Sequence, residues 1–513
     1  MTAARSAVLR DTFVDSVLLM GATRAMAETE GVVWATAVMA TPANVAALVA
    51  EGIDAADLEG ASANDLALAA RGASPDAADA ALSRGRDALF AERRAQAAGG
   101  AAPAARTVAE AVSASAGVNV AIVSVTGAYA ALAAHHALTA GLHVLLFSDH
   151  VGVDEEVELK DRAARMGRLV MGPGAGTAIL GGTGLGFANV VGAGRVGVVA
   201  AAGTGAQEVS SLLDRWGSGV SQVIGIGGRD LSAAVGGRMA RVAIAALEAD
   251  PGTDAILLVS KPPAEAVARD LLGAPRAKPL IAAVLGVAPD LEVGAGVRLC
   301  GTLEEGVVRT LEAVGVGVDD PGRGLAGRVA AAAGRLAAGR TAVRGLFSGG
   351  TLCYEAQLIL AGHVGRVYSN APVRRDDALP APDGAHVCLD LGEEEYTRGR
   401  PHPMIDPQAR LDLIRREAAD PATAVLLLDV VLGHGSHPDP AGMLAPVCAE
   451  ILAAPGAPAV VAYVLGTSAD PQGYDRQRAI LEEAGCVVTP TAARGAHAAA
   501  AIALRRPELA ESS

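Results

Sequence analysis

Aromatic residues and basic clusters are both scarce in this 513-residue sequence. Only 3% of its residues are aromatic although 51% are hydrophobic, so the core has to be built from Ala, Val, Leu and Ile. Asp and Glu (56) outnumber Lys and Arg (42), which gives a formal net charge of −14. Because the sequence has no dense basic cluster, neither a nucleic-acid surface nor a basic membrane anchor is expected.

Cysteine is rare as well. The five cysteines show no C-x-x-C spacing, so neither a disulfide framework nor a zinc site is indicated and no metal site is predicted. A reducing, cytoplasmic location is expected. Charged residues interrupt the apolar residues near Met1, and no signal peptide is predicted.

Asp, Glu, Lys and Arg are absent from Ala111 to Ser148, a stretch long enough to cross a bilayer. Its pattern changes along its length, from β-branched VNVAIVSVTG through Ala-rich AYAALAAHHALTAG to the short apolar run HVLLFSD. These three pieces predict strand, helix and strand in a buried parallel sheet rather than a membrane helix.

Short apolar strands alternate with helices from Gly117 onward, and this alternation predicts an α/β protein of several domains. A small α+β domain is expected over residues 1–95. Two segments poor in large apolar residues, 96–114 and 321–340, are interpreted as linkers.

Two similar turns each follow an apolar strand and open a helix. They are Gly203-Thr204-Gly205 and Ser348-Gly349-Gly350-Thr351, and their repetition indicates duplicated domains. Glycine backbones, hydroxyls and helix N–H groups suit a phosphate, although tight turns and helix caps use the same residues. Glu208 and Glu355 follow in these helices, where each would either orient a ligand or stabilise its own helix.

Three other segments are candidate sites. Two of them follow strands and would either cradle a nucleotide or acyl phosphate or form close-packed turns: Gly172-Pro173-Gly174-Ala175-Gly176-Thr177 and Gly225-Ile226-Gly227-Gly228-Arg229-Asp230. The loop Gly433–Pro440 follows a very apolar strand, so His434 and His437 are candidate ligand contacts. The alternative is ordinary turn chemistry.

Several motifs, in order, resemble a known family. GPGAGTAI, GRVGVVAAAGTGAQE and GIGGRDLS are similar to the α subunit of succinyl-CoA synthetase and other NDP-forming acyl-CoA synthetases, and SGGTLCYEA resembles that superfamily's phosphate turn. With FVDSVLLM, TPAN, HVLLFSDHV, SNAPV and DVVLGHGSHPDPAG, the chain is identified as a member of the FdrA family. The resemblance implies a CoA-binding-like Rossmann domain at 115–195 and flavodoxin-like CoA-ligase domains at 196–320 and 341–505.

The chain departs from the synthetases at their nucleophile. Their phosphohistidine segment corresponds to LIAAVLGVAPDLEVGAG, which contains no histidine. The glutamate that orients this histidine in the synthetases corresponds to Val259–Pro262, which contains no glutamate. Gly127–Ala130 replaces a glycine-rich CoA turn, which leaves Thr126, Gly127, Gly172 and Pro173 as the CoA- or nucleotide-like positions. No ATP-grasp domain is recognisable.

FdrA-like proteins are linked to oxamate carbamoyltransferase in allantoin breakdown, with separately encoded subunits. The resemblance therefore implies direct transfer from carbamoyl phosphate to oxamate, with the SGGT and GTG turns holding phosphate and the loop containing Gly227, Gly228 and Arg229 holding the carboxylate or oxyanion. One alternative is an acyl-CoA synthetase that uses another histidine, such as His437. The other is a non-catalytic subunit that binds CoA or a nucleotide.

The expected partners are small anionic substrates and other subunits in an oligomer, with neither nucleic acid nor membrane. CoA or a nucleotide is the candidate cofactor, and none is assigned. The predicted catalytic residues are Arg229, His437, Glu355 and Glu208.

Overall fold

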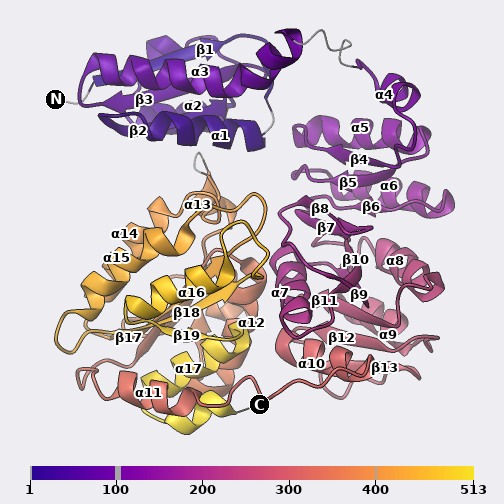
Figure 1. The fold of residues 1–513 in the computed structure, drawn as a ribbon, viewed down its shortest axis with the longest axis vertical. Helices are drawn as coiled ribbons and strands as arrows, with labels where there is room; N and C mark the ends of the chain where they lie inside the picture. Colours follow the sequence, from indigo (N-terminus) through magenta and orange to yellow (C-terminus); the bar gives the residue numbers. More distant parts are fainter. Residues whose placement is uncertain (1–2, 15, 99–104, 399–400, 513) are drawn as a thin grey trace. The chain divides into compact units, whose positions relative to one another are not determined.

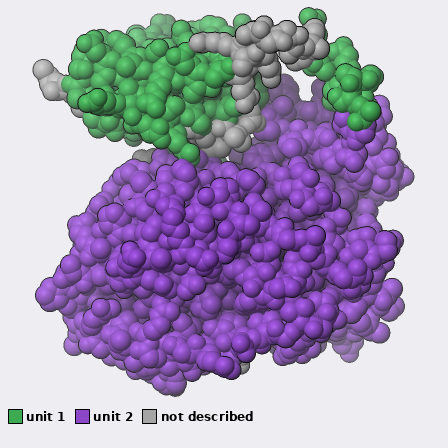
Figure 2. Space-filling view, in the orientation of Figure 1, with its two compact units in different colours: residues 1–116, 394–401 green, residues 117–393, 402–513 purple. Residues whose placement is uncertain are grey.

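The computed structural model describes residues 3–14, 16–98, 105–398 and 401–512. Contacts divide the chain into two compact units, residues 1–116 with 394–401 and residues 117–393 with 402–513 (Figure 2). Helices and strands alternate along both units (Figure 1), as the α/β prediction requires.

The first unit is a three-stranded antiparallel sheet with β3 at its centre, between β1 and β2. Side chains of β3 alternate between two small cores: Leu66 and Leu68 pack with residues of α1 and α3, whereas Ala67 and Ala69 pack with Leu48 of α2. Its elements are β1 (Ala3–Leu9), α1 (Ser16–Ala27), β2 (Val32–Met39), α2 (Pro42–Ala50), η1 (Ala55–Leu58), β3 (Leu66–Gly72), α3 (Pro75–Ala98), α4 (Val108–Ala114) and α13 (Glu394–Thr397). The linker predicted at 96–114 is thus partly helical, and its residues 99–104 lie outside the described part of the chain.

The second unit begins with a three-stranded parallel sheet of β4 (Val120–Val123), β5 (His143–Leu146) and β6 (Val170–Met171). Helix α5 (Gly127–Thr139) joins β4 to β5, and α6 (Val153–Arg165) joins β5 to β6. The segment without Asp, Glu, Lys or Arg therefore forms the predicted strand, helix and strand. None of the helices within the described ranges combines the length and apolar character that a membrane crossing needs.

A seven-stranded sheet follows, in the order β13-β12-β11-β9-β10-β7-β8. Its strands β9 to β13 are parallel, and the hairpin β7–β8 adds antiparallel to β10 although it lies within the predicted Rossmann-like domain. The elements are β7 (Thr177–Leu180), β8 (Thr183–Gly186), β9 (Ala193–Ala200), α7 (Gly203–Arg215), β10 (Val220–Gly225), α8 (Arg238–Ala249), β11 (Ala255–Ser260), α9 (Glu265–Gly273), β12 (Leu280–Val284), β13 (Val297–Cys300) and α10 (Leu303–Ala313).

The last sheet has six parallel strands in the order β15-β16-β14-β17-β18-β19. The predicted linker 321–340 contains the packed helix α11, because Leu325, Val329 and Ala332 give it a buried apolar side. The elements are α11 (Leu325–Ala333), β14 (Ala342–Phe347), α12 (Gly350–Val364), β15 (Val367–Tyr368), η2 (Arg375–Asp377), β16 (His386–Asp390), α14 (Gln408–Ala419), β17 (Thr423–Val431), α15 (Pro440–Leu452), β18 (Ala459–Leu465), α16 (Tyr474–Glu483), β19 (Val487–Thr489), α17 (Ala492–Leu504) and η3 (Pro507–Glu511).

Helices α7, α10, α12 and α17 contribute to one apolar core that includes strands of both large sheets. Two buried glutamates lie in this core. Glu208 of α7 accepts a hydrogen bond from the Tyr463 hydroxyl at 2.5 Å, and Oε1 of Glu355 in α12 accepts one from the Leu303 N–H at 2.6 Å. Burial raises the pKa of Glu208 to about 7 and the pKa of Glu355 to about 8, because water no longer stabilises either carboxylate.

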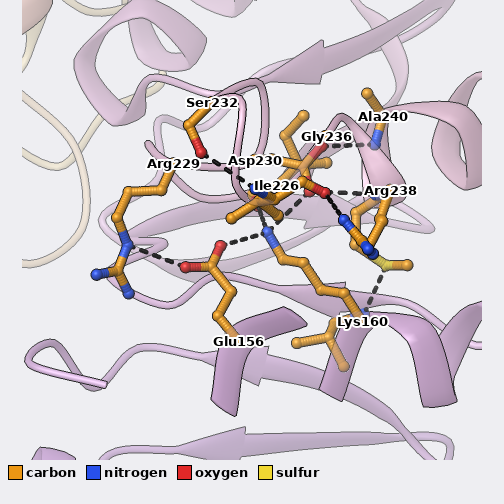
Figure 3. Close-up of polar contacts among 12 residues, drawn as sticks. Glu156, Lys160, Ile226, Arg229, Asp230, Ser232, Gly236, Arg238 and Ala240 are labelled. Atoms are coloured by element: carbon orange, nitrogen blue, oxygen red, sulfur yellow. Dashed lines mark hydrogen bonds and ion pairs between the residues drawn. The ribbon is translucent and has the colours of Figure 1, made fainter. Parts of the chain in front are cut away.

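A buried lysine connects the three-stranded layer to the seven-stranded sheet. Nζ of Lys160 in α6 donates to Glu156 at 2.8 Å, to Asp230 at 2.8 Å and to the Ile226 carbonyl at 2.9 Å (Figure 3). All three charged side chains are fully buried, and Asp230 also accepts from the Met239 and Ala240 N–H groups at the start of α8. Each ammonium proton therefore has an acceptor.

Replacing the lysine by Lys160→Met should destabilise the second unit by about 3–5 kcal/mol, because the ammonium that pairs with the buried carboxylates of Glu156 and Asp230 is lost. Denaturant unfolding followed by circular dichroism measures the effect. Arg269→Met is the control, since Arg269 pairs with Glu265 on the surface and should change the unfolding free energy by less than about 0.5 kcal/mol. Equal effects for both variants would contradict the buried network.

Glu355→Gln should become more stable relative to the parent chain as pH rises from about 5 to about 9. The unfolded carboxyl ionises near 4.5 and the folded one near 8, so the parent loses stability across this window while the amide does not. Each pKa unit of the shift corresponds to about 1.4 kcal/mol. Melting temperatures measured at several pH values test this, and a difference independent of pH would refute the buried acid.

Candidate functional site

Glycine-rich turns at the carboxyl ends of several strands meet around one cavity of about 300 Å³ in the second unit. The turns follow β6, β9, β10 and β14, which belong to all three sheets of the unit. The lining consists almost wholly of small residues: Gly174, Ala175, Gly176, Thr177, Ala200, Ala201, Ala202, Gly203, Thr204, Ala206, Gly225, Gly227, Gly228, Lys261, Gly350 and Thr351. Backbone therefore forms most of the wall.

Helix α7 begins at this cavity without a side-chain cap. Its N-cap residue is Ala202, and its first turn contains no acidic residue. The positive end of the helix dipole and the first N–H groups consequently lie where Gly203 and Thr204 line the cavity. This helix end is suited to bind an anion.

Helix α12 also begins at the cavity, but an internal carboxylate already occupies its amino end. Asp429, near the end of β17, accepts from the Ser348 N–H at 2.8 Å, the Ser348 hydroxyl at 2.8 Å and the Gly349 N–H at 2.7 Å. Arg410 adds a fourth hydrogen bond at 2.9 Å. The Thr351 N–H donates to the Thr204 hydroxyl of α7 at 3.2 Å, so the two helix ends are joined directly.

Lys261 supplies the positive side chain of the cavity lining. It follows β11 directly, and its Nζ lies 5.9 Å from the ring centre of Tyr354, which suits a cation–π contact. The sequence contains three lysines, Lys160, Lys261 and Lys278. Nearly all other basic residues of the chain are arginine. The ammonium of Lys261 is a compact point charge, which suits contact with a single oxyanion.

The structure brings together six of the predicted phosphate-site residues in the lining. These are Gly203, Thr204, Gly227, Gly228, Gly350 and Thr351. Gly205 lies behind them, where an added Cβ would be 3.0 Å from Thr351 Cγ2, so the glycine permits the close approach of α7 and α12. Ser348 and Gly349 were expected to bind phosphate. Their N–H groups donate to Asp429 instead and are therefore not free for a ligand.

Arg229 lies outside the lining and is engaged elsewhere. Its Nε is 2.9 Å from Glu156 Oε2, and its Nη2 donates to the Val151 carbonyl at 2.8 Å. Figure 3 shows Glu156 between Arg229 and Lys160. In this arrangement the Arg229 guanidinium bonds to Glu156 of α6 and to the Val151 carbonyl.

The other predicted catalytic residues also lie away from the lining. Glu208 and Glu355 are within the core between the two large sheets, since they occur more than one turn into their helices. The His437 N–H donates to the Met404 carbonyl at 2.8 Å, and its Nδ1 accepts from the Asp439 N–H at 3.0 Å.

The CoA-like positions follow β4 and β6, at the same edge of the three-stranded parallel sheet. Thr126 and Gly127 start α5. A Cβ on Gly127 would lie 2.3 Å from the Asp149 carbonyl oxygen, so the loop after β5 covers this glycine. Gly172 contacts the Leu146 and Gly227 backbones, and neither Gly172 nor Pro173 belongs to the lining. These glycines serve close backbone packing.

Sequence reasoning missed Lys261, whereas residues 174–177 of the lining belong to the candidate turn that begins at Gly172. Lys261 carried one usable signal, because it directly follows an apolar strand, as the glycine turns do. Together, a free helix end, glycine backbone and one ammonium can bind a small dianion and stabilise charge that develops on it.

Comparison with known families agrees with this architecture. A CoA-ligase family model matches residues 346–502, and a model described as AllF, heavy metal-associated domain matches residues 1–106. Residues 1–106 contain neither cysteine nor histidine, and no cluster of three or more metal-ligating side chains occurs among the described residues. The residues of this domain therefore do not fit a soft metal ion.

Two curated proteins and one solved structure illustrate the similarity. The dinucleotide-forming acetyl-coenzyme A synthetase 1 of Ca. Korarchaeum cryptofilum aligns over 77% of this chain and 84% of its own at 14% identity, with a TM-score of 0.25. The α subunit of the ADP-forming succinate–CoA ligase of Methanothermobacter thermautotrophicus is 30% identical over 147 residues, which cover 28% of this chain and 49% of that protein. The uncharacterized protein YahF of Escherichia coli K12 is 38% identical over 488 residues, 93% of this chain and 94% of its own. The chain therefore belongs to the FdrA-like family of proteins with the CoA-ligase fold.

Proposed function

We propose that this chain is the carbamoyl-phosphate-binding subunit of an oxamate carbamoyltransferase, which interconverts carbamoyl phosphate and oxamate with oxalurate and phosphate. The observation that supports it most is the small cavity itself, where the uncapped end of α7 and Lys261 offer positive charge to one dianion. The match to an AllF domain agrees with a role in allantoin breakdown.

The proposed step is a direct displacement. The amide nitrogen of oxamate forms a bond to the carbamoyl carbon, the bond from that carbon to the phosphate oxygen breaks, and the amide proton ends on the released phosphate. The amino end of α7 and Lys261 stabilise the charge that grows on the leaving phosphate. Gly227 and Gly228 offer backbone N–H groups to the carboxylate of oxamate, the role expected of the loop that contains them and Arg229.

A second candidate is an NDP-forming acyl-CoA synthetase, which the similarity to the succinate–CoA ligase α subunit favours. That reaction needs a group that carries phosphate between nucleotide and acyl substrate. No histidine occurs among the described residues of the cavity lining, and this supports direct transfer instead.

Activity assays separate the candidates. The purified chain, alone and with the products of neighbouring genes, is incubated with carbamoyl phosphate and oxamate, and separately with ATP, CoA and succinate. Phosphate release that depends on oxamate supports carbamoyl transfer. Acid-labile protein phosphate, lost in His437→Ala, supports the synthetase. Binding of CoA or nucleotide without turnover indicates a regulatory subunit.

Lys261→Met should raise the KM for carbamoyl phosphate at least about tenfold, because losing one charge-assisted contact costs about 1.5–3 kcal/mol. Steady-state phosphate release measures this. Lys278→Met is the matched control, since Lys278 donates to the Leu247 carbonyl at 2.9 Å and lies outside the cavity lining. An unchanged KM in Lys261→Met would show that the phosphate does not bind here.

A further inference from the structure

Asp390 ends β16 beside the cavity and is only 4% exposed. Its backbone is held on both sides by Asn370, which accepts from the Asp390 N–H and donates to the Asp390 carbonyl, each at 2.9 Å. Oδ1 accepts from the Gly392 N–H at 3.0 Å. Within the described part of the chain, no hydrogen bond is made to Oδ2.

The free oxygen faces the amino end of α12. A Cβ on Gly350 would lie 2.3 Å from Asp390 Oδ2 and 3.5 Å from Lys261 Nζ, so the carboxylate and the ammonium approach the same residue of the cavity lining. Glycine at position 350 leaves the space that the Asp390 carboxyl needs. Asp429, by contrast, has both oxygens bound to the Ser348–Gly349 turn and to Arg410.

The surroundings of Asp390 allow its carboxyl to exchange a proton near neutral pH. Burial raises its pKa to about 6, while the positive charge of Lys261 opposes the rise. The other titratable groups near it are Glu393, Asp429, Cys353 and His402. Burial lowers the pKa of His402 to about 4, so this imidazole is neutral where Asp390 titrates.

We propose that Asp390 is the catalytic base of the transfer, the carboxylate that takes the amide proton of the acceptor as its nitrogen attacks the carbamoyl carbon. This role rests on the proposed carbamoyl transfer. One N–H bond breaks and one O–H bond forms on Asp390, and the proton then passes to the leaving phosphate, which restores the carboxylate. Lys261 stays in contact with the leaving phosphate. One charged group therefore acts on the phosphate and the other, Asp390, acts on the attacking amide.

Anion binding tests the placement of Asp390 without any turnover. Sulfate remains a dianion from pH 5 to pH 7, so a change in its affinity over that range reports on the protein. Calorimetry should show sulfate binding weakening about tenfold as Asp390 ionises beside the cavity, and Asp390→Asn should abolish this change. Glu355→Gln is the control that keeps it, because Glu355 ionises only near pH 8.

Turnover tests the chemical role. With the partner proteins present, Asp390→Asn should lower kcat by about 10²–10⁴-fold and leave the KM for carbamoyl phosphate within about threefold. The fall of kcat/KM below about pH 6 in the parent should disappear in the variant. Glu393→Gln, a neighbouring acid, should keep the parent rate. Thermal unfolding at pH 8 should show Asp390→Asn to be at least as stable as the parent, since the variant no longer buries a charge.

The outcomes separate this role from the proposed function. A sulfate affinity that is independent of pH in the parent places Asp390 away from the anion and overturns the inference, whatever the activity. Oxamate-dependent turnover that survives in Asp390→Asn overturns the inference and leaves carbamoyl transfer standing. A parent chain that is inactive with oxamate and its partners overturns the catalytic role together with carbamoyl transfer.

Discussion

The four hydrogen bonds that Asp429 accepts determine the geometry of the cavity. They hold the Ser348–Gly349 turn and the Arg410 guanidinium around one buried carboxylate. Helix α12 can begin at the cavity because this internal anion satisfies N–H groups that would otherwise be unpaired. The Thr351 N–H then reaches Thr204, and this bond sets the end of α7 beside the end of α12.

An asymmetry follows from this arrangement. The two turns look equivalent along the chain, yet the one at α12 is already bound to Asp429, whereas no side chain caps α7. In the proposed site the anion is therefore bound by α7 and Lys261, while α12 contributes Gly350, Thr351 and the space for Asp390. In a protein with a net charge of −14, the proposed anionic substrate has to be attracted by this helix end and Lys261, because the overall field repels an anion.

Much of the fold was predictable from residue patterns. The β-branched runs and Gly stops between Ala111 and Ser148 located β4, α5 and β5, because strand and helix periodicities differ locally. The hairpin β7–β8 and helix α11 were not predicted. Thr183–Gly186 is rich in glycine, and residues 321–340 are rich in Gly and Ala, so neither segment has a strong apolar pattern of its own, and packing decides its conformation.

The sequence alone determined the candidate segments for a binding site: glycine turns that follow strands, in an acidic α/β chain of the FdrA-like family. Only the tertiary structure decided which of them share a site. It placed Gly203, Gly228 and Gly350 around one cavity, turned Arg229 toward Glu156, buried Glu208 and Glu355, and brought Lys261 and Asp390 to the same helix end. The reason is that pairing between distant residues, such as Asp429 with Ser348, depends on which strand ends are neighbours in space, and no local pattern records it.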